Sequence, residues 1–344
     1  MSVRTVLSCL LTLVATLCLH MDAAGKVIDV YYPPDRTVME FDLLSISLGI
    51  PKDSADHIKV ISNQGLPRDI FPSSENVCFT ITMEPGINNI AIIASKEGKV
   101  IDTSVIGVFR RSEIMSAYRK PPPGYTKSSF HSADNTKCGT CHTLKPSEDD
   151  RRPLNIARLK GDNEEGGQKK PNSTCYSCHK RMVNYSYVHG PASVWSCLSC
   201  HEPDEKPRYK VKVPDTEACF TCHTEQRNKW YSKKHIHGPV NMEKCTICHN
   251  PHATDYPFHL IKPSWELCVT CHAENSSGLH VLGDAFSSKG HPTRGKPDPM
   301  RKGKELSCAS CHNPHASDFS HLWQFDVNSL LELCTKCHGD KKVL

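Results

Sequence analysis

Short stretches in which apolar and polar residues alternate fill the first third of the chain. The six clearest are residues 27–32, 43–48, 58–61, 77–83, 90–94 and 100–109. Turn residues such as Glu97-Gly98-Lys99 separate these stretches, and the alternation is the pattern of strands that bury one face. Several short strands at such spacing are typical of a β-sandwich. We therefore predict an all-β, immunoglobulin-like sandwich over residues 25–115, with Cys78 as a buried core thiol.

The end of this predicted domain carries a local resemblance, and a change in composition follows it. Residues 85–90, Pro-Gly-Ile-Asn-Asn-Ile, with the strand after them, are similar to the end of bacterial immunoglobulin-like modules. Three consecutive prolines begin at Pro121. They exclude a helix or an inner strand and favour an extended, semi-stiff spacer. We predict a proline-rich linker over residues 116–130.

The N-terminus has the pattern of an export signal. Arg4 precedes an apolar stretch over residues 6–19, which suits the hydrophobic region of a signal peptide and is short for a membrane span. We predict a signal peptide over residues 1–24, with cleavage near Ala23 or Ala24. A retained membrane anchor is the alternative. A lipoprotein is disfavoured because bulky Leu17 precedes Cys18, where a small residue is needed.

Composition sets the remainder of the chain apart. Only 38% of the 344 residues are hydrophobic and the mean hydropathy is −0.45, so a large all-protein core is not expected. The chain has 19 Cys and 20 His, and 16 of the cysteines lie in residues 131–344. The net charge of +5 comes without a Lys/Arg block interleaved with aromatic residues, so nothing indicates nucleic-acid binding.

The cysteines of this region form eight Cys-x-x-Cys-His motifs, numbered 1 to 8 in chain order. Their first cysteines are Cys138, Cys175, Cys197, Cys219, Cys245, Cys268, Cys308 and Cys334. Their second cysteines are Cys141, Cys178, Cys200, Cys222, Cys248, Cys271, Cys311 and Cys337. Their histidines are His142, His179, His201, His223, His249, His272, His312 and His338. The motif is the attachment signal of c-type haem: two thiols bind the vinyl groups on one porphyrin edge, and the histidine ligates the iron from the proximal side. We predict eight haem c groups, each with its iron, in a multihaem cytochrome c domain over residues 131–344. Its chain should be mostly coil with short helices wrapped around stacked haems.

Two other interpretations of paired cysteines fit less well. Structural zinc sites use Cys-x-x-Cys pairs, but zinc gives no reason for a histidine directly after every second cysteine. Disulfides are common in exported proteins and likewise do not need that histidine. A thioredoxin-type redox motif occurs on a βαβ unit, and the sequence pattern shows none.

Each iron also needs a second axial ligand or an open position. The region holds ten histidines outside the motifs and three methionines, so mainly bis-histidine ligation and low reduction potentials are expected. The distal ligands predicted for six haems are His131, His189, His237, His252, His291 and His315. Two of the following four should serve the others: His235, His259, His280 and His321.

Internal repeats rank these candidates. Motifs 5 and 7 both continue as Cys-His-Asn-Pro-His, which ends in His252 and His315, and a further histidine stands upstream of each pair of motifs. The resulting module, a histidine followed by two motifs, occurs about four times. The modules are numbered 1 to 4 in chain order and begin at His131, His189, His237 and His291. The module resembles the doubled-CXXCH multihaem cytochromes, which include periplasmic electron carriers and the multihaem subunits of porin–cytochrome conduits in metal-reducing bacteria. The first two modules depart from it: His142 precedes Thr-Leu-Lys, and His201 precedes Glu-Pro-Asp.

The resemblance implies respiratory or extracellular electron transport in the periplasm, at the outer membrane or outside the cell. It implies other redox proteins or cytochromes as partners. We expect an electron carrier and no catalytic residues. Two alternatives stay open: an octahaem oxidoreductase of nitrogen or sulfur compounds with one open haem, and a subunit of a cytochrome filament or a porin–cytochrome conduit.

Overall fold

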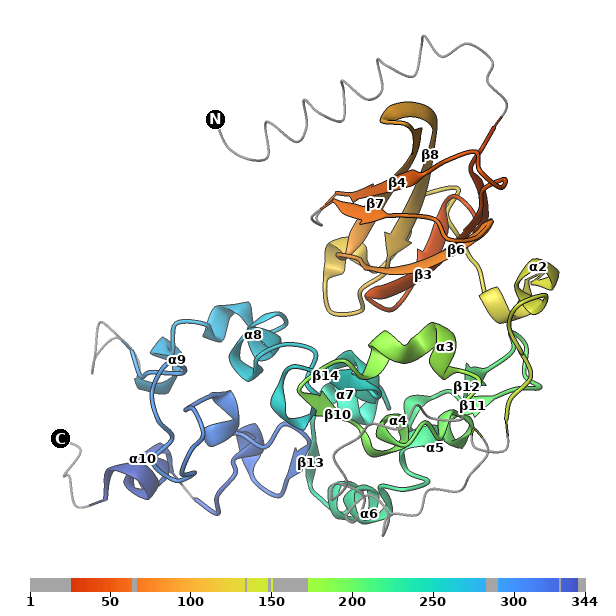
Figure 1. The fold of residues 1–344 in the computed structure, drawn as a ribbon. Helices are drawn as coiled ribbons and strands as arrows, with labels where there is room; N and C mark the ends of the chain where they lie inside the picture. Colours follow the sequence, from red (N-terminus) through yellow and green to blue (C-terminus); the bar gives the residue numbers. More distant parts are fainter. Residues whose placement is uncertain are drawn as a thin grey trace, which may run out of the picture. The chain divides into compact units, whose positions relative to one another are not determined.

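A computed structural model of the chain describes residues 26–63, 67–133, 135–147, 150, 173–282, 290–327 and 329–339. The chain divides into two compact units (Figure 1). We call residues up to 112 together with 117–130 the β unit, and residues 113–116 with 131–344 the motif unit. The predicted signal peptide lies outside the described residues. Within the described residues, no helix has the length and apolar character that a membrane span requires.

The β unit consists of two sheets. Its strands are β1 (Asp29–Tyr32), β2 (Thr37–Met39), β3 (Leu43–Gly49), β4 (His57–Ser62), β5 (Arg68–Ile70), β6 (Asn76–Thr82), β7 (Gly86–Lys96), β8 (Lys99–Arg110) and β9 (Thr126–Lys127). One sheet has the order β1-β3-β6 and the other the order β5-β4-β7-β8-β2-β9. All six strands predicted from the alternating pattern are present, and β2, β5 and β9 are additional. The immunoglobulin-like topology remains a prediction.

One apolar core joins the two sheets. Leu44, Ile46 and Leu48 on β3 pack in the same buried cluster as Ile90 and Ile92 on β7. Alternate residues of a strand point to opposite faces, which explains why a β-rich sequence with short apolar runs closes on a single core. The sheet architecture is therefore set by the pattern of apolar positions.

The same alternation corrects one prediction. Cys78 is exposed, whereas its neighbours Val77 and Phe79 are buried. The two neighbours occupy the core face of β6, so the residue between them must point to the other face. The prediction of a buried core thiol was wrong because the face of the strand decides burial here, and Cys78 lies on the outer face.

The proline-rich segment is more than a spacer. After the prolines, β9 pairs in parallel with β2 through Thr37↔Thr126 and Val38↔Lys127. The Phe130 ring then packs edge-on against Tyr32 with 5.3 Å between ring centroids. Residues 117–130 consequently group with the β unit. Proline excludes an inner strand, but an edge strand that begins beyond it is allowed.

The motif unit is built from short elements (Figure 1). Its α-helices are α2 (Thr136–Gly139), α3 (Tyr176–His179), α4 (Gly190–Ser193), α5 (Asp215–Cys219), α6 (Thr224–Tyr231), α7 (Gly238–Asn241), α8 (Ser264–Val269), α9 (Leu279–Leu282) and α10 (Leu330–His338). Its strands have two residues each: β10 (Tyr187–Val188), β11 (His201–Glu202), β12 (Lys210–Val211), β13 (His235–Ile236), β14 (Ala253–Thr254) and β15 (Ala316–Ser317). α10 contains motif 8 and begins after Ser329, whose side chain accepts a hydrogen bond from the Glu332 N–H.

Neighbouring modules are joined by these short strands. β14, directly after His252, pairs with β10, directly before His189. β15, directly after His315, pairs with β13, directly before His237. The chain that follows the first motif of one module therefore runs beside the chain that opens the preceding module.

Candidate haem-binding sites

Most motifs share one local geometry. In six of them the histidine N–H donates to the carbonyl of the first cysteine at 2.9–3.1 Å, which closes a helical turn. These are motifs 1, 2, 4, 5, 6 and 7. Because residues four apart lie on one face of such a turn, the first cysteine and the histidine are presented on the same side. This is the arrangement that a covalently bound porphyrin with a proximal histidine requires.

Six motif histidines each face a second imidazole from elsewhere in the chain. The ring centroids are 6.0–6.3 Å apart in the pairs His131–His179, His189–His223, His201–His252, His237–His272, His249–His315 and His291–His338. Every non-motif member is one of the six distal ligands ranked first from the sequence. The ring planes are within 29° of parallel in five pairs and are 88° apart in His291–His338.

This spacing fits one metal ion between two imidazoles. A metal–imidazole bond of about 2.0–2.1 Å on each side, with the distance from nitrogen to ring centre added, puts the two centroids about 6.3 Å apart. Direct packing of the ring faces would bring carbon atoms to about 3.5–4.0 Å. The observed spacing exceeds direct packing and matches bis-histidine ligation.

Backbone carbonyls fix the orientation of several rings. His189 Nδ1 lies 2.9 Å from the Pro251 carbonyl oxygen, and His237 Nδ1 lies 3.0 Å from that of Pro314. On the motif side, His249 Nδ1 lies 2.8 Å from the Phe258 carbonyl oxygen. A carbonyl only accepts, so Nδ1 carries the proton in each case. Nε2 is then left with its lone pair, which is the usual preparation of a metal-ligating histidine.

The trailing histidines of motifs 5 and 7 are positioned by the asparagine before them. The Asn250 side-chain oxygen accepts from the His252 N–H at 3.0 Å, and Asn313 does the same for His315 at 3.0 Å. Asparagine commonly makes such a turn with the backbone two residues on. The asparagine of the Cys-His-Asn-Pro-His sequence thus fixes the turn that directs the last histidine toward the preceding module.

Burial keeps the facing histidines neutral. Desolvation, followed by the neighbouring histidines, lowers the pKa of His131, His252 and His315 to about 4. A neutral imidazole is the form that ligates a metal. At neutral pH these three rings are therefore ready to bind iron without first losing a proton.

The four lower-ranked histidines have different surroundings. His280 interacts electrostatically with His312 of motif 7, and this contributes, after burial, to lowering the pKa of His280. The His259 ring packs edge-on against His189 at 5.4 Å. His321 lies 5.8 Å from the Trp323 ring and His235 is on β13. Two of the four are associated with His312, which has no facing imidazole in the six pairs. His280 interacts with it electrostatically, and the His321 carbonyl oxygen lies 2.6 Å from His312 Nδ1.

The cysteines show that consecutive motifs adjoin one another. Three pairs of thiols from consecutive motifs interact, which raises the pKa of the first thiol and lowers the pKa of the second; these pairs are Cys175–Cys197, Cys219–Cys245 and Cys268–Cys308. Burial raises the pKa of four other thiols, and cysteines of the next motif raise it further; these four are Cys138, Cys200, Cys248 and Cys311. Each motif is thus next to the one that follows it, from motif 1 to motif 8.

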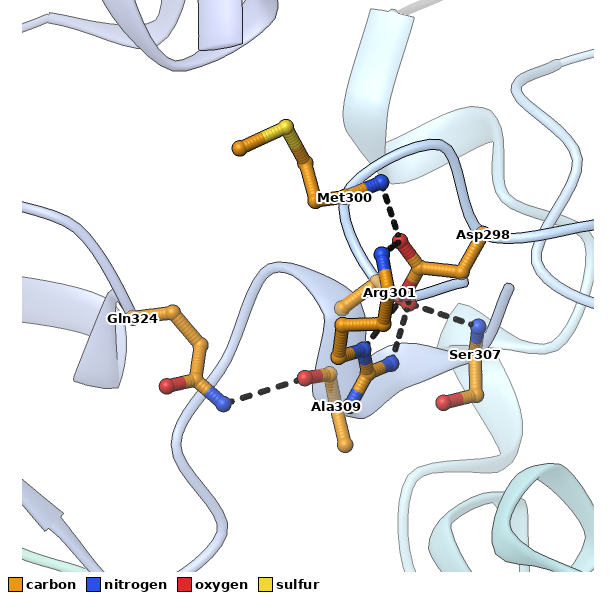
Figure 2. A network of polar contacts seen from close by, with 7 residues as sticks. Asp298, Met300, Arg301, Ser307, Ala309 and Gln324 are labelled. Atoms are coloured by element: carbon orange, nitrogen blue, oxygen red, sulfur yellow. Dashed lines mark hydrogen bonds and ion pairs between the residues drawn. The ribbon is translucent and has the colours of Figure 1, made fainter. Parts of the chain in front are cut away.

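Acidic side chains that sequence reasoning missed anchor some of the motifs. The Asp298 carboxylate accepts from the Arg301 guanidinium at 2.6 Å and from the Ser310 hydroxyl at 2.7 Å (Figure 2). Ser310 and Ala309 stand between the cysteines of motif 7, and Gln324 donates to the Ala309 carbonyl at 3.1 Å. The Asp298 residue is only 5% exposed, so its bonds fix the backbone on which the cysteines sit.

Two other motifs have related anchors. The Asp215 carboxylate accepts from the N–H and hydroxyl of Thr246 at 2.7 and 2.8 Å, and Thr246 lies inside motif 5. Buried Asp150 accepts from the Ser173 hydroxyl and from the Thr174 N–H, just before motif 2. These contacts are long-range in sequence or lie outside the motif, so the motif spacing alone gave no signal for them.

The side-chain positions do not favour a structural zinc site. Among the described residues, the one group of three or more potential ligands is Asp150, Cys175 and Cys197, whose ligand atoms lie within 4.8 Å of one another. It contains two first cysteines from different motifs and no four-sulfur cage of the kind that structural zinc requires. The cluster is explained by motifs 2 and 3 lying side by side.

The comparisons with known proteins agree with the motif geometry. The doubled CXXCH motif family matches residues 189–228, 237–277 and 298–343, which are modules 2, 3 and most of 4. These paired motifs indicate covalently bound haem c and haem-based electron transfer. Among curated proteins none matches.

Solved structures give only distant likenesses. A fibronectin(III)-like module structure of Clostridium thermocellum CbhA has 10% identity and a TM-score of 0.20, and covers 24% of this chain and 94% of that one. The sulfur carrier protein SoxY from Chlorobium limicola f thiosulfatophilum has 15% identity and a TM-score of 0.20, and covers 25% and 80%. Both scores are too low to carry an argument.

Proposed function

We propose that this protein carries electrons along eight covalently bound haem c groups arranged in the order of the motifs. The observation that carries the proposal is the set of six histidine pairs at 6.0–6.3 Å, each with one member in a motif. Bound haem iron accepts and releases single electrons at potentials that its axial ligands set. The paired histidines would hold the iron of the haems that lie between them, and the cysteines would hold each porphyrin to the chain.

The assignment of ligands follows from the pairs. The upstream histidine of each module serves the second motif of the same module: His131 serves motif 2, His189 motif 4, His237 motif 6 and His291 motif 8. The trailing histidines His252 and His315 serve motifs 3 and 5, each in the preceding module. His280 serves motif 7. At the motifs with two histidines, this ligation would exclude small molecules from the iron, which favours a carrier over an enzyme.

Contact between consecutive motifs supports the use of this series as a path. The thiols of motifs 2 and 3, 4 and 5, and 6 and 7 are close enough to shift each other's pKa, so the attachment edges of neighbouring groups would adjoin.

We also propose where this transfer takes place. An exported location, in the periplasm, at the outer membrane or outside the cell, follows from the signal-like N-terminus and the use of c-type attachment. Partners would be other redox proteins or cytochromes. The β unit carries no motif, so its proposed role is to dock the motif unit to a porin, a conduit or another copy of the chain.

Potentiometry of a matched pair of variants tests the ligand assignment. His252→Met should raise the potential of one haem by roughly 100–200 mV, because a methionine ligand favours the reduced iron, with the haem count unchanged. The changed haem should be that of motif 3, which His252 faces. His235→Met, at an unpaired position, is the control and should titrate like the parent. A parent-like titration of His252→Met would contradict the assignment.

A further inference from the structure

The ligand pattern of the modules predicts which residue should complete motif 1. In module 3 the trailing histidine His252 faces His201, the first motif histidine of module 2. In module 4 the trailing histidine His315 faces His249, the first motif histidine of module 3. The trailing position of module 2 should by the same rule face His142, the first motif histidine of module 1.

That trailing position is occupied by an aspartate. Three residues after the motif histidine, module 3 has His252 and module 4 has His315, whereas module 2 has Asp204 in the sequence Cys-His-Glu-Pro-Asp. The departure in module 1, where Thr-Leu-Lys follows His142, has no such consequence because no earlier module needs its trailing residue. The loss of a histidine therefore concerns motif 1 alone.

The backbone around Asp204 keeps one feature of the repeat and loses another. The chain after each of the first motif histidines folds back on it in modules 2, 3 and 4, through His201↔Val211, His249↔Leu260 and His312↔Trp323. In modules 3 and 4 a strand directly after the trailing histidine pairs with the preceding module, whereas no strand is present in the described residues 205–209 after Asp204. The loop still reaches module 1, since the Arg208 N–H donates to the Ser132 hydroxyl at 2.9 Å.

The surroundings of His142 agree with this ligand pattern. Every histidine from residue 26 onward lies in the described part of the chain. Within that part, no second imidazole is placed against His142 as one is against six other motif histidines. Asp204 is exposed, so its carboxylate is solvated.

From this we infer that the haem iron of motif 1 keeps an exchangeable sixth position, open to a small lone-pair donor of the class of carbon monoxide, cyanide or imidazole. Asp204 stands where the repeat places a ligand, and an exposed carboxylate leaves that position polar and accessible. The motif 1 end of the series is thus a ligand-responsive terminus. This inference rests on the proposed function, because it requires a haem on motif 1.

Carbon monoxide titration of the reduced holoprotein tests the inference, with a haem count on the same sample. The parent should bind one carbon monoxide for eight haems. Asp204→His should abolish this binding, and Asp204→Asn should retain it. The reverse change, His315→Asp, should raise the stoichiometry from one to two by opening motif 5.

Each other result has a defined meaning. Eight haems with no carbon monoxide bound would overturn the inference and leave the proposed function intact. Fewer than eight haems would contradict the proposed function itself. Binding in dilute protein that disappears as the chain self-associates would also overturn the inference, because a second copy would then supply the sixth ligand.

Discussion

The two units of this chain bury different kinds of side chain. In the β unit, aliphatic residues such as Leu44, Ile58 and Ile92 are fully buried on paired strands. In the motif unit, small or polar residues such as Asp150, Thr216 and Ser310 are buried beside a few apolar ones such as Leu267. A chain region of that composition has little apolar area to offset the entropy of ordering. The comparison teaches that the β unit can fold from its sequence alone, whereas the motif unit depends on groups attached to it.

Withholding haem should separate the two units most strongly. Chain produced without haem attachment should keep the sheets of the β unit, while residues 131–344 lose their helices and become sensitive to protease. Circular dichroism and limited proteolysis of the haem-free and mature chains measure this. The fragment 26–130 is the matched control and should fold in both cases. A motif unit that resists protease without haem would show that its own side chains suffice.

A core substitution in the β unit should destabilise the β unit and leave the motif unit unchanged. Ile92→Ala removes a side chain with no exposed surface and should cost about 2–5 kcal/mol of unfolding free energy. Val105→Ala, at a residue 54% exposed, is the control and should change it by less than about 0.5 kcal/mol. Denaturant unfolding of fragment 26–130 gives both values. The haem spectrum of the full chain should be the same in both variants, and a changed spectrum would mean that the units are interdependent.

The smallest predicted effect concerns the anchor of motif 7. Burial alone raises the pKa of Asp298, but the bonds from Ser310 and Arg301 outweigh it and hold the pKa below its ordinary value. Asp298→Ala leaves these donors unpaired and should destabilise the motif unit by about 1–3 kcal/mol. A carboxylate with a lowered folded pKa stabilises the fold above its unfolded pKa of about 3.9 and loses that contribution as the pH falls through the folded value.

Thermal unfolding at two pH values checks this prediction. The melting temperature of the parent should exceed that of Asp298→Ala at pH 7. This difference in melting temperature should shrink as the pH falls well below 4. Asp326→Ala, a substitution in the same unit at a carboxyl outside the network, is the control and should show no such dependence. A difference between parent and Asp298→Ala that is independent of pH would contradict the electrostatic explanation.

The sequence predicts much of the site and a part of the fold. The period-two pattern located six strands of the β unit, but it did not reveal β2, β5 or β9, since strands of two or three residues are too short to show an alternation. The internal repeats identified His252 and His315 as distal ligands. They did not indicate that each of these histidines faces the preceding module. That relation depends on the pairing of β14 with β10 and of β15 with β13. The anchors Asp150, Asp215 and Asp298 were missed because an isolated aspartate gives no signal until its partners are placed.

The central claim is that all eight motifs carry haem c. Intact mass measurement of the mature protein tests it most directly, with a pyridine haemochrome assay on the same sample to identify the haem type. We predict a mass excess of eight haems over the processed polypeptide and a c-type haemochrome spectrum. A polypeptide mass with bound zinc and no haem absorbance would contradict the claim entirely.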